Sequence, residues 1–309
     1  TGRHHIIRII ALVVLRYGTP QKFHAIFIRQ GDDPDYVMSP GDNSLPRTAA
    51  ARFSPYNTTD SKLNDISEFL VDVGPAYGNS EFTKYPSQAG AFYQWANDPN
   101  PVAYHPVKPV KPHLWLGALT GKYWSMVSSA QESCPSGYHR PSDGITNWAA
   151  ANTSTTGIES SEIRQSLYVT PTMGSSVSSV NFRWGYYADG FFDRRDHNNP
   201  DIPSPGLGGS AIKANTAASW RTKDVAYIGV LIFNPTAGNS RENASLFIPA
   251  AGSRHADTGA LIEAGEVATF LSSSSPDTDQ MWYYVGTEVS SYQLNSTRRH
   301  GLSQRSVRN

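Results

Sequence analysis

The sequence predicts a β-rich α+β fold, and three observations carry that prediction. Only 17% of the 309 residues are charged, whereas 25 are Gly and 21 are Pro, a composition that favours strands and loops over solvated helices. Several apolar runs in the second half are bounded by Gly, Pro, Asn or Ser, as short strands are. A few segments show the three- to four-residue spacing of short helices. The chain is also long enough to bury a sizeable core in one large domain or two ordinary ones.

The first 46 residues form a small β unit in this prediction. The run IIRIIALVVL (6–15) is rich in Ile and Val and predicts one strand, RYGTPQK (16–22) a connection, and FHAIFIRQ (23–30) the return strand of a hairpin. Two strands alone are marginally stable. The hairpin must therefore pair with the following domain, with a lost N-terminal domain or with another subunit. A turn-rich linker (31–46) leads to the main domain, 47–309.

The main domain begins with helices and irregular segments. Apolar residues at helical spacing predict a helix in SKLNDISEFLVDVG (61–74), capped by Asp60 or Ser61. Further helices are expected after Ser142, which would be an N-cap, and over 160–168. AGAFYQWA (89–96) predicts a short strand, and the prolines of PVKPVKP (106–112) predict extended chain without a regular ladder.

The second half of the main domain reads as strands and turns. The expected strands lie in 225–233, 244–252, 265–273 and 281–289, and alternating residues in the tail predict a final one.

Composition and motifs exclude several classes of function. Equal numbers of basic and acidic residues, 26 each, argue against nucleic-acid binding, which relies on a basic surface. No run approaches the ~20 apolar residues of a membrane span, so we expect no transmembrane segment. The run 6–15 lacks a following cleavage site, and we expect a mature or trimmed product. No Walker loop, dinucleotide fingerprint, G-x-S-x-G or H-E-x-x-H occurs, so no cofactor is expected.

Two stretches offer candidate chemistry. Cys134, the one cysteine in the chain, lies five residues before His139, which could act as its base if the thiol were a nucleophile. An inert, packed thiol is the alternative. The loop DRRDHNNPD (193–201) has the oxygen-rich makeup of a calcium site, with Asp193, Asp196 and Asp201, but lacks the order of an EF-hand. A polar surface loop is the alternative there, and we expect no resident metal.

The stretch 272–297 is dense in Ser, Trp, Tyr, Asn, Gln and Thr. Tyr and Trp give a large contact area at low entropic cost, and Ser and Asn give adaptable hydrogen bonds, as in antibody paratopes. The alternative is that the aromatic residues alternate inward along strands and fill the core. Trp282 and Tyr284 would share one face and Tyr283 the other, so both interpretations can hold together.

Five blocks of residues carry a family resemblance: GAFYQWA, CPSGYHRPSDG, WGYYADGFFDRR, SLFIPAAGSR and TRRHGLSQRSVRN. In this order and spacing they resemble the Fibrobacter succinogenes major paralogous domain over about residues 47–309. That domain occurs in surface proteins of gut Bacteroidetes, including fimbrillin-like tip pilins. IFIRQGDDPDYVM also resembles the segment that precedes the domain in such proteins, often after an immunoglobulin-like module.

The resemblance implies a C-type lectin-like fold, shared with formylglycine-generating enzymes and with hypervariable receptor-binding proteins. In the hypervariable relatives, C-terminal strands and loops display the ligand surface. The residues at the matching place, and therefore the candidates for ligand contact, are Trp282, Tyr284, Ser290, Tyr292, Asn295 and Thr297. The family tail ends in a V-R-C-V-like motif, whereas Ser306 stands here where the second cysteine would be. Cys134 is then the structural survivor of a pair.

The resulting expectation is a secreted cell-surface adhesin or fimbrial tip subunit of a Bacteroides-like bacterium, without catalysis. It would bind a host, bacterial or glycan ligand through its C-terminal face, and would offer its N-terminal β unit to another pilin subunit by strand addition. One alternative is a receptor-binding protein diversified by a retroelement. The other is a carbohydrate-active or thiol-dependent enzyme on the same fold, which the lone cysteine weakens because formylglycine-generating enzymes use a pair.

Overall fold

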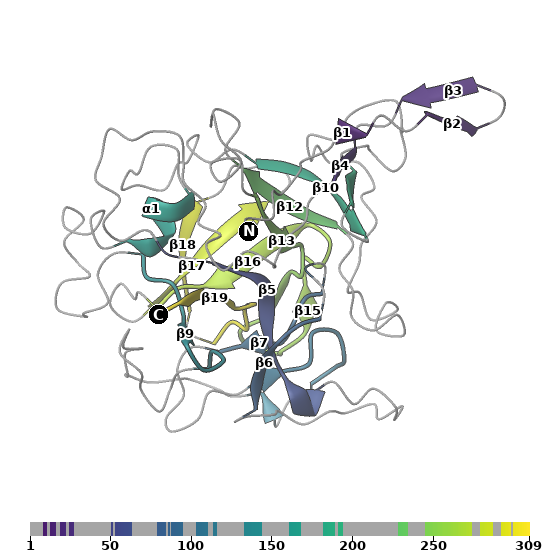
Figure 1. Ribbon diagram of the computed structural model, residues 1–309. Helices are drawn as coiled ribbons and strands as arrows, with labels where there is room; N and C mark the ends of the chain where they lie inside the picture. The colour runs from purple at the N-terminus through teal and green to yellow at the C-terminus, as the bar shows by residue number, and fades with distance from the viewer. Residues whose placement is uncertain are drawn as a thin grey trace.

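The structure is a computed structural model, and its described part is spread over the whole chain. The described residues are 9–10, 13–16, 19–22, 25–27, 51, 53–63, 79–84, 86, 88–94, 103–110, 114–115, 133–143, 161–167, 182–188, 191–193, 228–233, 245–273, 279–286, 292–297 and 299–309. Within them the protein is β-rich, with antiparallel sheets that curl around one another (Figure 1). The helices with described bounds are α1 (Glu162–Leu167) and the 3-10 turn η1 (Ser61–Leu63).

The largest sheet has six strands, all paired antiparallel. Their order is β1 (Ile9–Ile10), β4 (Ala25–Phe27), β11 (Phe191–Asp193), β10 (Phe182–Ala188), β12 (Ile228–Phe233) and β13 (Ser245–Pro249). The glycine at position 229 of β12 is required by close packing, because a Cβ there would lie 2.3 Å from the carbonyl oxygen of Ile248 and 2.6 Å from the ring of Phe247. Only glycine lets these two strands approach so closely.

The predicted N-terminal hairpin is confirmed, with a shorter connection than expected. Strands β2 (Val13–Arg16) and β3 (Thr19–Lys22) pair antiparallel, so the second half of the expected connection is itself a strand. The ladder continues between β1 and β4, and β4 then pairs with β11 of the main sheet. The hairpin therefore pairs with the following domain, while its β2–β3 end projects away from the rest of the molecule (Figure 1).

Two smaller sheets bring the C-terminal part of the chain together with its middle. One has the order β16 (Val267–Leu271), β17 (Asp279–Gly286) and β18 (Tyr292–Thr297). The other has the order β6 (Ser80–Phe82), β5 (Phe53–Asp60), β19 (Arg305–Arg308) and β9 (Tyr138–His139). Two short ladders complete the set: β7 (Phe92–Tyr93) with β8 (Ala103–Tyr104), and β14 (Ser253–Arg254) with β15 (Leu261–Ile262).

Most predicted elements that fall on described residues are confirmed. The expected strands correspond to β7, β12, β13, β16, β17 and β19, and the helix of 160–168 is α1. Residues 105–110 join no ladder between strands, as their prolines predicted. For the expected helix 61–74, the described part is η1, where the backbone N–H of Lys62 donates to Asp60 Oδ1 at 2.9 Å. The rest of that helix and the one expected through Trp148 lie outside the described residues.

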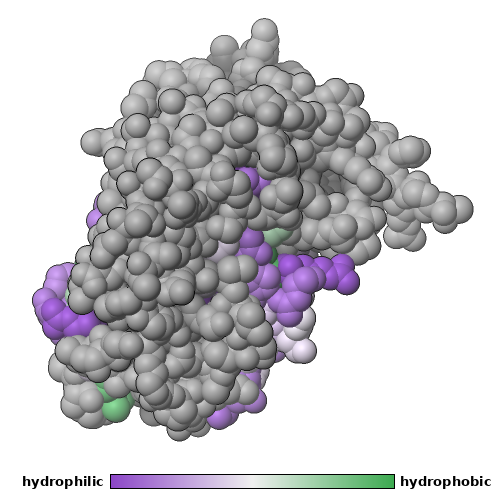
Figure 2. Space-filling model, turned by 90° about the vertical axis from the view of Figure 1, so that its left-hand side faces the viewer, coloured by the Kyte–Doolittle hydropathy of each residue, from purple (hydrophilic) through white to green (hydrophobic). Residues whose placement is uncertain are grey.

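Two apolar clusters form the described core. The larger one joins the main sheet, β16, β5 and α1, and includes an edge-to-face pair of Phe53 and Phe270 with ring centroids 5.9 Å apart. The smaller one gathers Phe92, Tyr104 and Trp115 with alanines. On the face shown in Figure 2, the described residues that reach the surface are mainly hydrophilic, with small hydrophobic areas. Among the described helices, none is long and apolar enough to span a membrane.

Candidate functional site

The sheet of β16, β17 and β18 carries most of the predicted ligand contacts. Tyr284 lies directly opposite Tyr292, and Trp282 opposite Leu294, so these positions share one face of the sheet. Asn295 lies opposite Met281 and Thr297 opposite Asp279, which places both on the other face. The register therefore brings three of the predicted contacts together and separates two from them. Ser290 lies outside the described residues, and the binding roles stay predictions.

Strand β16 is the buried edge strand of this sheet. All five of its residues are buried, and Thr269 donates a hydrogen bond from its hydroxyl to the carbonyl of Gly252 at 3.0 Å. Tyr284 is paired with Thr269 and Trp282 with Leu271, whereas Phe270 of the main core is paired with Tyr283. In the described ladder order β18 is the outer strand. The sheet thus runs from a fixed core strand to an edge that carries Tyr292.

The two positions that the resemblance pairs, Cys134 and Ser306, lie in contact. The Ser306 hydroxyl donates to Cys134 Sγ at 2.9 Å, and Gln304 Nε2 donates to the same sulfur at 2.9 Å. The Ser306 hydroxyl also lies 2.9 Å from Thr58 Oγ1. A chain of hydrogen bonds therefore links β5, β19 and the segment before β9 at the place where the resemblance implies a cysteine pair.

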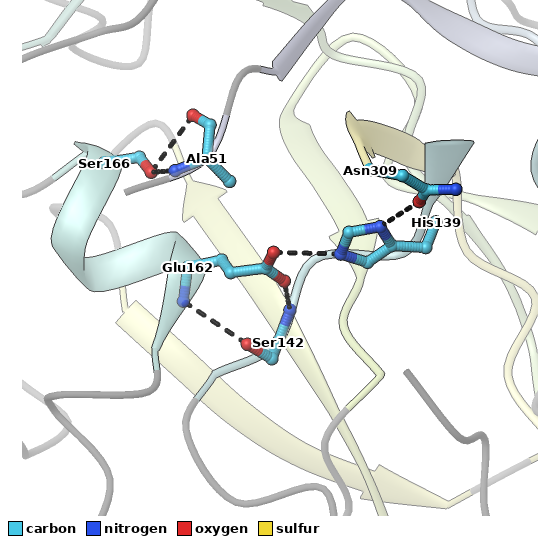
Figure 3. Close-up of polar contacts among 6 residues, drawn as sticks. All are labelled: Ala51, His139, Ser142, Glu162, Ser166 and Asn309. Atoms are coloured by element: carbon cyan, nitrogen blue, oxygen red, sulfur yellow. Dashed lines mark hydrogen bonds and ion pairs between the residues drawn. The ribbon is translucent and has the colours of Figure 1, made fainter. Parts of the chain in front are cut away.

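His139, the expected base for a reactive Cys134, is engaged elsewhere. Its Nε2 lies 2.9 Å from Glu162 Oε1, and its Nδ1 lies 2.6 Å from Asn309 Oδ1 (Figure 3). Carboxylate and amide oxygens thus lie against the two ring nitrogens of the imidazole. Cys134 Sγ accepts hydrogen bonds from Ser306 and Gln304, and its role as a structural thiol stays a prediction.

Helix α1 joins two distant parts of the chain, the segment 139–143 and Ala51. The Ser142 amide donates to Glu162 Oε2 at 2.8 Å, and the Ser166 hydroxyl accepts from the Ala51 amide at 2.8 Å (Figure 3). On the buried side, Arg164 makes a bidentate ion pair with Asp143 at 2.6 and 2.9 Å. A six-residue helix cannot be stable alone, so these contacts are what define it. Ser142 Oγ also accepts a hydrogen bond from the Glu162 amide in the first turn of α1 at 3.3 Å, whereas the helix that Ser142 was expected to cap lies outside the described residues.

A second polar cluster lies between the residues that follow β14 and the residues that follow β18. The rings of His255 and His300 meet edge to face with centroids 6.2 Å apart, and Arg299 pairs with Asp257 at 2.8 Å. Burial lowers the pKa of His300 from its usual value, and the nearby His255 and Arg299 lower it further while Asp257 opposes them. Sequence reasoning missed this cluster. Its one signal was the pair of Arg-His dipeptides, 254–255 and 299–300.

The predicted calcium loop is described only at its first residue. Asp193 ends strand β11, and Asp196 and Asp201 lie outside the described residues. Within the described part of the chain, no group of three or more acidic, His or Cys side chains is arranged to hold a metal ion.

Comparison with known proteins does not assign the chain to a family. No protein-family model, curated protein or solved structure matches it.

Proposed function

We propose that the chain is a cell-surface adhesin or fimbrial tip subunit, secreted and held at the outer surface of a bacterium. Residues 47–309 would form a C-type lectin-like domain that binds a host, bacterial or glycan ligand without catalysis. The observation that carries the proposal is the register of β17 and β18, which sets Tyr284 against Tyr292 and places Trp282 on the same face. Three aromatic residues at adjoining positions on one face of β17 and β18 suit a ligand surface, because aromatic rings supply contact area at low entropic cost.

The N-terminal hairpin supports the assembly half of the proposal. Strands β2 and β3 pair with each other and project from the molecule, whereas β1 and β4 anchor the hairpin to the main sheet (Figure 1). The outer edges of a two-stranded ladder can serve as templates for pairing with another chain. Another pilin subunit is the partner we propose.

Binding to a glycan array and to target cells, with and without a calcium chelator, tests the ligand face. Trp282→Ala and Tyr292→Ala should abolish binding while circular dichroism and thermal unfolding stay close to those of the parent protein. Asn295→Ala, on the opposite face of the same strand, is the matched control and should lose much less. Equal losses at both faces would indicate contact at the strand edge, and unchanged binding in all three variants would refute the proposal.

Assembly is tested by removing the projecting strands alone. Because Ile10 pairs with Ala25, residues 11–24 can be replaced by Asn-Gly, a two-residue turn that keeps β1 and β4 paired. This variant should keep its fold and any ligand binding but fail to enter fimbriae. Normal incorporation would show that the hairpin is not the assembly element.

A further inference from the structure

The cluster of His255 and His300 joins two segments that are far apart in the sequence. The turn 255–260 is closed by hydrogen bonds from the His255 amide to the Ala260 carbonyl at 2.8 Å and from the Gly259 amide to the His255 carbonyl at 2.9 Å. The 299–301 segment begins two residues after β18 ends at Thr297. The two segments are linked by backbone hydrogen bonds in both directions between Arg254 and Gly301, at 2.7 and 3.1 Å.

The hydrogen bond and the ring contact at this junction have geometries that suit uncharged imidazole rings. His255 Nδ1 accepts a hydrogen bond from the Asp257 amide at 3.2 Å, which a protonated nitrogen cannot do. The rings meet edge to face with centroids 6.2 Å apart, a geometry that suits uncharged aromatic rings. Protonation of both rings would place like charges in contact and remove an acceptor from the turn.

Among the described residues, the other charged groups that act on His300 are Arg299 and Asp257. Arg299 repels an imidazolium at this position, and Asp257 attracts it. The Asp257 carboxylate is already paired with Arg299 Nη1 at 2.8 Å, which reduces what it can offer to the histidines. The pKa of His300 is accordingly lowered, with burial as the main cause.

We propose that His255 and His300 form an acid-sensitive latch, which holds the segment that follows β18 at neutral pH and releases it when both rings are protonated. The latch would regulate the proposed ligand surface, since Tyr292 and its neighbours lie on the strand that leads into it. That consequence rests on the proposed function, whereas the latch itself can be measured in the protein without any ligand.

The direction of the pH effect follows from the lowered pKa. The unfolded chain takes up a proton near pH 6.5, before the folded one does, so the latch is fully stabilising above pH 6.5 and is lost as pH falls through the folded pKa. Two unit charges 6.2 Å apart change an equilibrium roughly threefold at the dielectric of water and roughly a hundredfold at that of a protein surface. The equilibrium constant for opening the latch should increase at low pH by a factor within that range.

Amide hydrogen exchange at pH 7.5 and pH 5.0, corrected for intrinsic rates, tests the latch. The Gly301 amide, which donates to Arg254, should open more often at pH 5.0, while the Thr58 amide, which donates to Gln304, should keep its protection and serves as the internal control. The double variant His255→Gln/His300→Gln should lose the pH effect at Gly301. Asp257→Asn removes the carboxylate that favours the imidazolium, so it should lower the pKa of His300 further and enlarge the rise in Gly301 opening between pH 7.5 and pH 5.0. This variant tests the same idea if the double variant fails to fold.

The proposal is overturned if Gly301 protection is the same at both pH values, or if the pH effect persists in the double variant. Either result would leave the adhesin proposal standing, because that proposal depends on Trp282 and Tyr292. Unchanged cell binding in the Trp282 and Tyr292 variants, together with an intact latch, would be the reverse case. The two ideas can therefore fail separately.

Discussion

Replacing Ser306 with cysteine should close a disulfide with Cys134. The two side chains already touch, with Ser306 Oγ 2.9 Å from Cys134 Sγ. The longer Cβ–S bond of cysteine would close much of the remaining gap to a sulfur–sulfur bond of about 2.05 Å. The substitution would restore the cysteine pair that the resemblance implies, between the segment before β9 and strand β19.

The expected stabilisation is large because the cross-link closes a long loop. The two residues are 172 positions apart. The chain-entropy expression that gives about 4.7 kcal/mol for a 100-residue loop gives about 5 kcal/mol at this length, since it grows with the logarithm of loop size. Loss of the hydrogen bond between Ser306 and Thr58 costs about 1 kcal/mol. The free energy of unfolding of the oxidised variant should therefore be about 4 kcal/mol higher than that of the parent protein.

Thiol titration in denaturant and urea unfolding together check this prediction. Oxidised Ser306→Cys should run as a monomer on a non-reducing gel and show no titratable thiol, whereas the reduced form should show two. Adding Cys134→Ser to Ser306→Cys removes the cross-link while keeping the new side chain, and that control should lose the stabilisation. Two reactive thiols after mild oxidation would refute the placement of β19 beside Cys134.

Other predictions concern a buried ion pair and a strained turn. Asp143→Ala should lower the free energy of unfolding by about 3–5 kcal/mol, because it leaves the Arg164 guanidinium buried without its carboxylate, whereas Asp257→Ala in an exposed pair should cost about 0–1 kcal/mol. Glu263 has a φ of 57°, and Glu263→Asn should stabilise the protein by about 0.5–1 kcal/mol in the same urea assay. Burial and the nearby Glu266 raise the pKa of Glu263, so stability is lost as pH rises above about 4.5 through the folded pKa. The gain should therefore be larger at pH 7 than at pH 4, and a smaller gain at pH 7 would contradict the charge argument.

Elements whose residues bury an apolar face could be predicted from the sequence. Strands β12, β13 and β16 come from runs such as VLIF and ATFL, where the local pattern and the final environment agree. Helix α1 was predicted from spacing, although its stability comes from Asp143 and Ser142, which no local pattern connects to it. The same holds for the contact of Cys134 with Ser306, which spacing alone could not supply.

Strand β5 could not be predicted, because its residues look like those of a polar loop. Asn57, Thr58 and Asp60 are nevertheless buried. Asn57 Nδ2 donates to the Ala89 carbonyl at 2.7 Å, and Asp60 Oδ2 accepts from the Asn79 amide at 3.0 Å. The partners lie 19 to 32 residues away in the sequence. Only the folded chain therefore supplies the hydrogen bonds that offset the cost of burying these polar side chains.

Buried arginines supply hydrogen-bond donors to irregular segments of the chain. Arg254 has almost no exposed surface, and its guanidinium donates to the carbonyls of His105, Lys108 and Gly259. Burial lowers its pKa to about 10, so it stays charged at neutral pH and keeps all its donors. The segment 105–110 joins no ladder between strands, and carbonyls of such a segment need donors from elsewhere.

A planar guanidinium can serve several carbonyls at once, whereas the ammonium of lysine is a single point of charge. Arg305 acts in the same way, joining the Ser54 carbonyl at 3.0 Å to that of Phe247 at 2.8 Å. It does so beside the irregular stretch of β5, where the register with β19 shifts. In the described part of the fold, arginine donors therefore serve carbonyls that a regular sheet would pair with backbone amides.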